Sequence, residues 1–169
     1  MTAPNVSPQR EAGKPLASRK NEAIKAWIAA VLWLIVIATE STSYLSSQNT
    51  SRILYPILHF LFRMGWERFE YWHFYIRKAG HVFGYGTLSI LLFRALRATA
   101  PGAIKPLWTV RWSIFAILGT AVVATLDEWH QTFIPSRTGS IHDVILDTCA
   151  GIGAQILVVL WKVRFSRQN

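Results

Sequence analysis

The sequence has few charged residues and a single cysteine. Only 16% of its 169 residues are charged, whereas 51% are hydrophobic and the mean hydropathy is positive. This balance argues against a soluble core and predicts an integral membrane protein. The single cysteine, Cys149, excludes an intramolecular disulfide. Because it lies within an apolar run, we expect its side chain to be small, hydrophobic and buried.

Acidic residues are also scarce, with nine Asp and Glu against 18 Lys and Arg and a net charge of +9. A strongly basic chain can bind nucleic acid, but here the basic residues form no single patch interleaved with aromatic residues. They flank the apolar runs instead, where positive charge sets the orientation of a membrane protein. Nucleic acid is therefore not an expected partner.

The apolar runs predict an all-α integral membrane protein. Residues 1–21 are polar and contain three prolines, which predicts a disordered cytoplasmic tail before a transmembrane domain at 22–165 and a short tail at 166–169. A helix needs about 20 residues to cross a hydrocarbon core about 30 Å thick. Four stretches reach this length, so we predict a small bundle with transmembrane helices at 23–40, 71–93, 112–134 and 143–161.

The region of the first two spans leaves alternatives open. The first span could instead be a signal peptide, because Val36, Ile37 and Ala38 offer small residues for cleavage, although the basic region before it is long for one. After it, residues 53–66 are apolar but short and contain Pro56. They predict an interfacial or re-entrant segment rather than a further span.

The basic residues predict the orientation. With four spans, twelve of the 18 Lys and Arg fall on the same side as the N-terminus. The positive-inside rule then places both termini in the cytoplasm of a multi-pass protein of the cell membrane. The remaining six fall outside, and they are Arg52, Arg63, Arg68, Arg77, Lys78 and Arg137.

Polar residues gather toward the outer ends of the spans. Lys78, His81 and Tyr85 share one helical face because they are spaced i, i+3 and i+7. Two further pairs have i, i+4 spacing, namely Asp127 with Gln131 and Asp143 with Asp147. All these residues are expected at a similar depth in the membrane, together with Glu40 and Glu128.

A charge near the bilayer centre costs about 2.5–3.5 kcal/mol, so this cluster needs partners, water or a ligand. One interpretation is a hydrophilic cavity that opens to the outer leaflet. The other is a set of ion pairs that only lock the bundle, such as Lys78 with Asp127 and Arg137 with Asp143. In addition, Ser140 stands three residues before Asp143, a pattern typical of a helix N-cap.

Three motifs resemble those of the VanZ-like integral membrane proteins, a family named for a teicoplanin resistance protein. They are KAGHVFGY at 78–85, DEWHQ at 127–131 and PSRTGSIHDVILDTCAG at 135–151. The likeness extends from about Glu40 to Val163 and includes Ser46-Ser47-Gln48, while Asp147 stands where the family often has Asn. The family pattern falls on Lys78, His81, Tyr85, Asp127, Glu128, Gln131, Arg137, Asp143 and Gly151.

The resemblance implies a multi-pass protein of the cell envelope, and two functions fit the cluster. The first is a membrane enzyme that acts on a lipid-linked or phosphorylated envelope component, with a membrane lipid or lipid-linked precursor as its partner. Crowded acids could supply a general acid or base, and cations would bind phosphate oxygens. We predict as catalytic residues Asp127, Glu128, His81 and Asp143, and as substrate-binding residues Lys78, Tyr85, Gln131, Arg137 and Asp147.

The second function is a non-catalytic binding or barrier protein that gives resistance to glycopeptide or lipopeptide antibiotics through the same cavity. The sequence leaves enzyme activity open, because no Ser or Cys adjoins a base in a recognisable nucleophile motif. The carboxylates could also hold a divalent cation, with oxygen ligands favouring Mg²⁺ or Ca²⁺. No metal-ligand spacing in the sequence is diagnostic.

Overall fold

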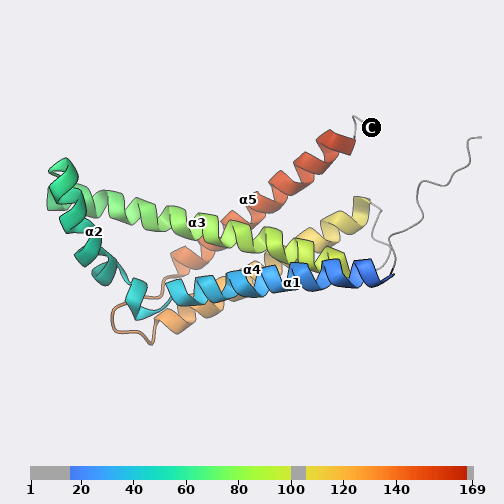
Figure 1. Cartoon of the computed structure of the whole chain (residues 1–169), viewed down its shortest axis with the longest axis horizontal. Helices are drawn as coiled ribbons and strands as arrows, with labels where there is room; N and C mark the ends of the chain where they lie inside the picture. The colour runs from blue at the N-terminus through green and yellow to red at the C-terminus, as the bar shows by residue number, and fades with distance from the viewer. Residues whose placement is uncertain (1–15, 100–105, 167–169) are drawn as a thin grey trace, which may run out of the picture.

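The computed structural model describes residues 16–99 and 106–166, and all regular elements in these two ranges are helical (Figure 1). This confirms the all-α prediction. A short 3₁₀ turn, η1, links the first two helices at Ser43–Leu45. The α-helices are α1 at Leu16–Glu40, α2 at Ser47–Phe62, α3 at Trp66–Thr99, α4 at Pro106–Gln131 and α5 at Ile141–Ser166.

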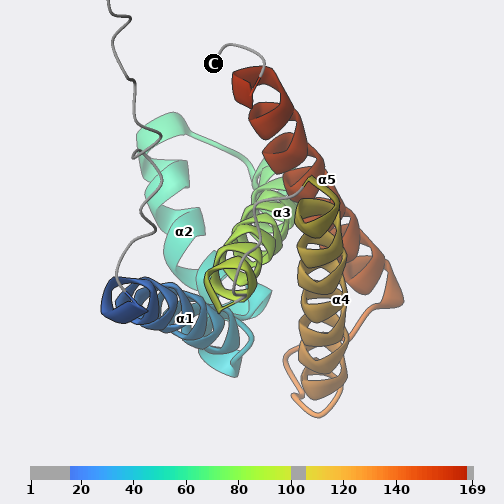
Figure 2. The same ribbon diagram turned by 90° about the vertical axis from the view of Figure 1, so that its right-hand side faces the viewer.

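The helix α3 lies at the centre of the bundle. It packs against α1, α4 and α5, and α4 also packs against α5. Figure 2 looks along the bundle and shows α3 between α1 on one side and α4 with α5 on the other. The helix α2 packs against the N-terminal part of α3, where Tyr55 makes edge contacts with the rings of Trp66 and Phe69.

Three helices are long and apolar enough to cross a membrane, namely Ala17–Glu40, Val110–Gln131 and Ile141–Trp161. The second of the four predicted spans, 71–93, lies within α3, which is 34 residues long but is not among these three. Its central position explains its composition, because a helix that faces protein on several sides can carry polar residues that a lipid-facing helix cannot. The count of four spans is therefore not confirmed.

The outer surface of the helices is apolar, as expected of a protein solvated by lipid. On α1, Ile28, Leu32 and Ile35 are each more than half exposed, at 53%, 58% and 56%. By contrast, the buried core is small and centres on the side chains of Tyr85 and Leu88. A chain that exposes such large apolar side chains along three spanning-length helices is a membrane protein.

Several sequence predictions need correction or stay untested. The helix α1 begins at Leu16, inside the tail predicted for residues 1–21. The predictions for residues 1–15 and 167–169 lie outside the described residues. Residues 53–62 belong to α2, which ends before a left-handed residue at Arg63 (φ 49°), and a re-entrant path is not confirmed. The prediction for Cys149 was wrong, because its side chain is exposed on α5.

Close helix contact occurs at Gly151. A Cβ built at Gly151 would lie 3.0 Å from Cγ2 of Thr120 on α4, so even an alanine here would require Thr120 to move by a few tenths of an ångström. At the same level, the Ser89 hydroxyl of α3 donates to the Gly151 carbonyl at 3.2 Å. The GxxxG spacing of Gly80 and Gly84 also predicts a tight contact, but a Cβ at either glycine would meet open space.

Candidate functional site

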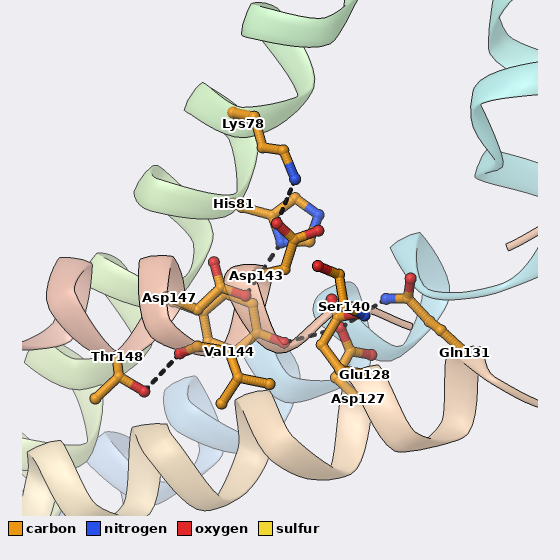
Figure 3. A network of polar contacts seen from close by, with 11 residues as sticks. Lys78, His81, Asp127, Glu128, Gln131, Ser140, Asp143, Val144, Asp147 and Thr148 are labelled. Atoms are coloured by element: carbon orange, nitrogen blue, oxygen red, sulfur yellow. Dashed lines mark hydrogen bonds and ion pairs between the residues drawn. The ribbon is translucent and has the colours of Figure 1, made fainter. Parts of the chain in front are cut away.

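The polar residues lie at the end of the bundle where α1 and α4 end and α5 begins, while α3 passes through this level (Figure 3). The loop 132–140 that joins α4 to α5 closes the site on one side. Its backbone approaches α4 closely, because a Cβ at Gly139 would clash with the backbone carbonyl oxygen of Glu128 on α4 and would lie 3.3 Å from the carbon of the same carbonyl. Only glycine fits there, and the following residue, Ser140, then reaches the Glu128 carboxylate.

Lys78 and Asp143 form an ion pair between α3 and α5. Their side chains are 31% and 16% exposed, so the pair is partly accessible. Lys78 thus pairs with Asp143 and not with Asp127, the pair offered as an example for the interpretation in which ion pairs lock the bundle. Asp143 lies in the first turn of α5, where a carboxylate also interacts favourably with the positive end of the helix dipole.

Asp127 is held by uncharged donors. The Tyr85 hydroxyl of α3 donates to its Oδ2 at 2.9 Å, and the Gln131 amide, one turn further along α4, donates to the same oxygen at 3.1 Å. Tyr85 is itself buried, with 2% exposure. These contacts explain why the sequence places a tyrosine and an amide at this depth, since each supplies a hydrogen bond to a carboxylate that is partly removed from water.

Arg137 connects the α4–α5 loop to the end of α1. Its guanidinium donates to the backbone carbonyl of Glu40 and, at 3.1 Å, to that of Thr42. Such carbonyls at a helix C-terminus lack helical partners, so Arg137 acts as a cap for α1. The predicted pairing with Asp143 was wrong. Burial lowers the pKa of the guanidinium, with Arg77 adding to the effect, but the group stays charged because arginine starts so high.

Three side chains form a deeper group, one each from α3, α4 and α5. His81 Nδ1 lies 3.2 Å from Asp147 Oδ2, and Glu128 Oε2 accepts the Ser140 backbone N–H at 2.7 Å. Asp147 and Glu128 are buried, with 0% and 4% exposure. One potential ligand atom from each of His81, Glu128 and Asp147 lies within 4.8 Å of the others, so these residues could hold a metal ion.

A cavity of about 430 Å³ opens beside this group. Its volume falls in the range of about 300–1,000 Å³ that small-molecule sites occupy. Five of the predicted site residues line it, namely Lys78, His81, Gln131, Arg137 and Asp143. Tyr85 and Asp127 line a smaller hollow of about 30 Å³ that shares His81, Gln131 and Arg137 with the cavity. Glu128 and Asp147 line neither and lie behind the wall.

The cavity also has lining residues that the sequence did not identify, notably Glu70, His73 and Arg77 on α3. Of these, His73 is buried, stacks on Phe69 and hydrogen-bonds to Thr50 at 3.1 Å. A signal for these residues was present, because His73, Arg77 and His81 follow one another at i, i+4 and i+8.

The fold and the site define a helical membrane protein with a polar cluster enclosed between its helices. The VanZ/LLP1 family model matches residues 26–163, and the chain belongs to this family. The match covers α2, α3, α4 and most of α1 and α5, so it includes every predicted site residue. Comparison with curated proteins gives no match, and comparison with solved structures gives none either.

Proposed function

We propose that this protein crosses the cell membrane four times and binds the phosphate-bearing headgroup of a lipid or lipid-linked envelope component at its outer face. In addition to the three helices of spanning composition, we propose α3 as a span. It has 34 residues, whereas a crossing requires about 20. Its packing against three other helices supports a position inside the bundle. The 12-to-6 distribution of basic residues supports cytoplasmic termini and an outward-facing site.

The observation that carries the proposed ligand is the set of cations around the cavity. Arg77, Lys78 and Arg137 line it together with only two carboxylates, Glu70 and Asp143. Arginine and lysine are the side chains that bind phosphate oxygens most strongly, and they do so best where water is partly excluded. A lipid in the surrounding leaflet would supply the apolar tail, and the cavity would hold its headgroup.

The remaining predicted residues divide into two roles in this proposal. His81 and Gln131 contact the ligand from the cavity wall, and Asp143 orients the Lys78 ammonium group through their ion pair. Asp127 and Tyr85 keep α3 and α4 in register through their hydrogen bond of 2.9 Å, which makes them positioning residues. The proposal is one of binding and includes no reaction step, since the cavity cations alone account for phosphate recognition.

Native mass spectrometry of the detergent-purified protein tests this function. We expect the wild-type protein to retain a phosphorylated lipid or lipid-linked precursor. The Arg77→Met variant should retain at least about tenfold less of this lipid, because it lacks one phosphate contact. The matched control is Arg94→Met, which removes an exposed arginine from the same helix outside the cavity. Equal retention by all three proteins would refute phosphate binding in this cavity.

The same experiment separates the second candidate, an antibiotic-binding barrier protein. In that case, teicoplanin added to the wild-type protein should give a complex, and Arg77→Met should form less of it. The wild-type protein without teicoplanin should then retain no phospholipid. This outcome would replace the lipid proposal with the resistance function that the family name suggests.

We expect both termini on the cytoplasmic side, because that side then holds most of the basic residues. Reporter fusions at Asn169 and at Thr138, in the loop beside the cavity, should report opposite sides of the membrane. A fusion at Arg52, between α1 and α3, should agree with the Thr138 fusion. If Asn169 reports the outside, the cavity faces the cytoplasm and an outer-leaflet ligand is ruled out.

A further inference from the structure

The group of His81, Glu128 and Asp147 contains two buried carboxylate oxygens that the bundle leaves without partners. Asp147 Oδ1 and Glu128 Oε1 have no hydrogen-bond partner among residues 16–99 and 106–166. Both carboxylates are more than nine-tenths buried. Buried acceptors almost always have a partner, and a cation between these two carboxylates would satisfy both oxygens at once.

We propose that His81, Glu128 and Asp147 bind a divalent transition-metal ion with the preferences of zinc. One ligand atom from each residue lies within 4.8 Å of the others. Two atoms bound to one such ion, each at about 2.0–2.2 Å, lie about 3–4 Å apart. The His81 Nδ1 to Asp147 Oδ2 distance of 3.2 Å already meets this value, and small side-chain movements would bring Glu128 to it.

Charge supports the same assignment. When both are ionised, Glu128 and Asp147 place two negative charges in a buried site, and His81 can balance only one of them when protonated. Lys78 does not help, because it is paired with Asp143. A divalent ion on the three ligands would make the group neutral, which greatly reduces the cost of burying it between helices.

The ligand types select the class of metal. Mg²⁺ and Ca²⁺ prefer sets of oxygen ligands, whereas an imidazole with two carboxylates suits Zn²⁺ and its neighbours in the transition series. This refines the divalent-cation hypothesis from the sequence, which favoured Mg²⁺ or Ca²⁺ from the carboxylates alone. Three protein ligands leave at least one coordination position for water or for a ligand oxygen.

The ion would lie at the wall of the cavity, since His81 belongs to both the metal group and the cavity lining. An oxygen of the cavity's contents could then take the open coordination position. The metal site nevertheless goes beyond the proposed headgroup binding and does not require it, because the cavity cations Arg77, Lys78 and Arg137 are not among its ligands.

Elemental analysis of the protein purified without added chelator tests the site. We expect about one transition-metal ion per wild-type chain, and at least about tenfold less in His81→Asn and Asp147→Asn. The matched control is Asp143→Asn, one helical turn from Asp147, which should keep its metal. Only monodisperse preparations are compared, so that unfolded variants do not count as metal-free. A second control, Arg77→Met, should keep its metal even if it no longer retains a phosphorylated lipid.

A second measurement covers variants that do not fold. Wild-type protein stripped with a chelator should gain at least about 5 °C in Tm when Zn²⁺ is added in large excess over its Kd, and no more than a trivial amount with Mg²⁺. The proposal is overturned if wild-type protein carries no such metal and Zn²⁺ leaves Tm unchanged. Equal metal loss in Asp143→Asn, or stabilisation by Mg²⁺ alone, would also overturn the assigned site.

Discussion

Lys78→Met combined with Asp143→Leu should give a stable, membrane-inserted protein that has lost its phosphorylated ligand. In the wild-type protein the two side chains form an ion pair between α3 and α5, with exposures of 31% and 16%. Replacing both partners with apolar residues of similar size removes the cost of desolvating them, so the stability of the double variant should stay close to that of the wild type. Without Lys78 the cavity has one phosphate-binding cation fewer, so we expect the ligand to dissociate.

The single variants should behave differently. Lys78→Met leaves the Asp143 carboxylate without its cation, and Asp143→Leu leaves the ammonium group without its anion. Breaking a fully buried pair costs about 3–5 kcal/mol, and partial exposure here reduces this to about 2–3 kcal/mol. For a chain of this length the Tm should fall by about 5–10 °C in each single variant and by little in the double variant.

Thermal unfolding in detergent and native mass spectrometry on the same preparations measure the two effects separately. A stable double variant that still retains the lipid would show that these charges only hold α3 and α5 together. That result would favour the interpretation in which the polar residues lock the bundle. A double variant as unstable as the two single ones would contradict the treatment of Lys78 and Asp143 as one pair.

The sequence predicted the elements of this protein well because each depends on local pattern. Three of the four predicted spans correspond to helices of spanning length, and the i, i+4 spacing of Asp143 and Asp147 placed both on one face of α5. The boundaries were less predictable. The helix α3 begins at Trp66, before the predicted start at residue 71, and the rings of Trp66 and Phe69 in its first turn pack against Tyr55 of α2.

The partners of the charged residues could not be read from the sequence. Depth alone allowed Lys78 to meet Asp127 or Asp143, and only the rotation of α4 relative to α5 decides between them. Asp127 turns toward Tyr85, which leaves Asp143 to Lys78. Similarly, the carbonyl groups of Glu40 and Thr42 that hold Arg137 carry no sequence signal, because every residue has a carbonyl.

Gly151→Leu should disrupt both the bundle and the site, with a loss of at least about 3 kcal/mol in the free energy of unfolding. A Cβ at this position would already lie 3.0 Å from Thr120 Cγ2 and 3.6 Å from Ser89 Cβ, and the three further carbons of leucine would add to this crowding between the helices. The helix α4 would have to move away from α5. Because α4 carries Glu128 and α5 carries Asp147, we also expect loss of any bound metal.

The control for this variant lies two residues further along the same helix. A Cβ at Gly153 would meet nothing within 4 Å, so Gly153→Leu should be tolerated and even gain a few tenths of a kcal/mol from the higher helix propensity of leucine. Thermal unfolding of both variants in the same detergent measures the difference, and we expect Gly151→Leu to melt at least about 10 °C lower. Equal melting temperatures would mean that α4 and α5 do not meet at Gly151, and the positions of Glu128 and Asp147 would then also be wrong.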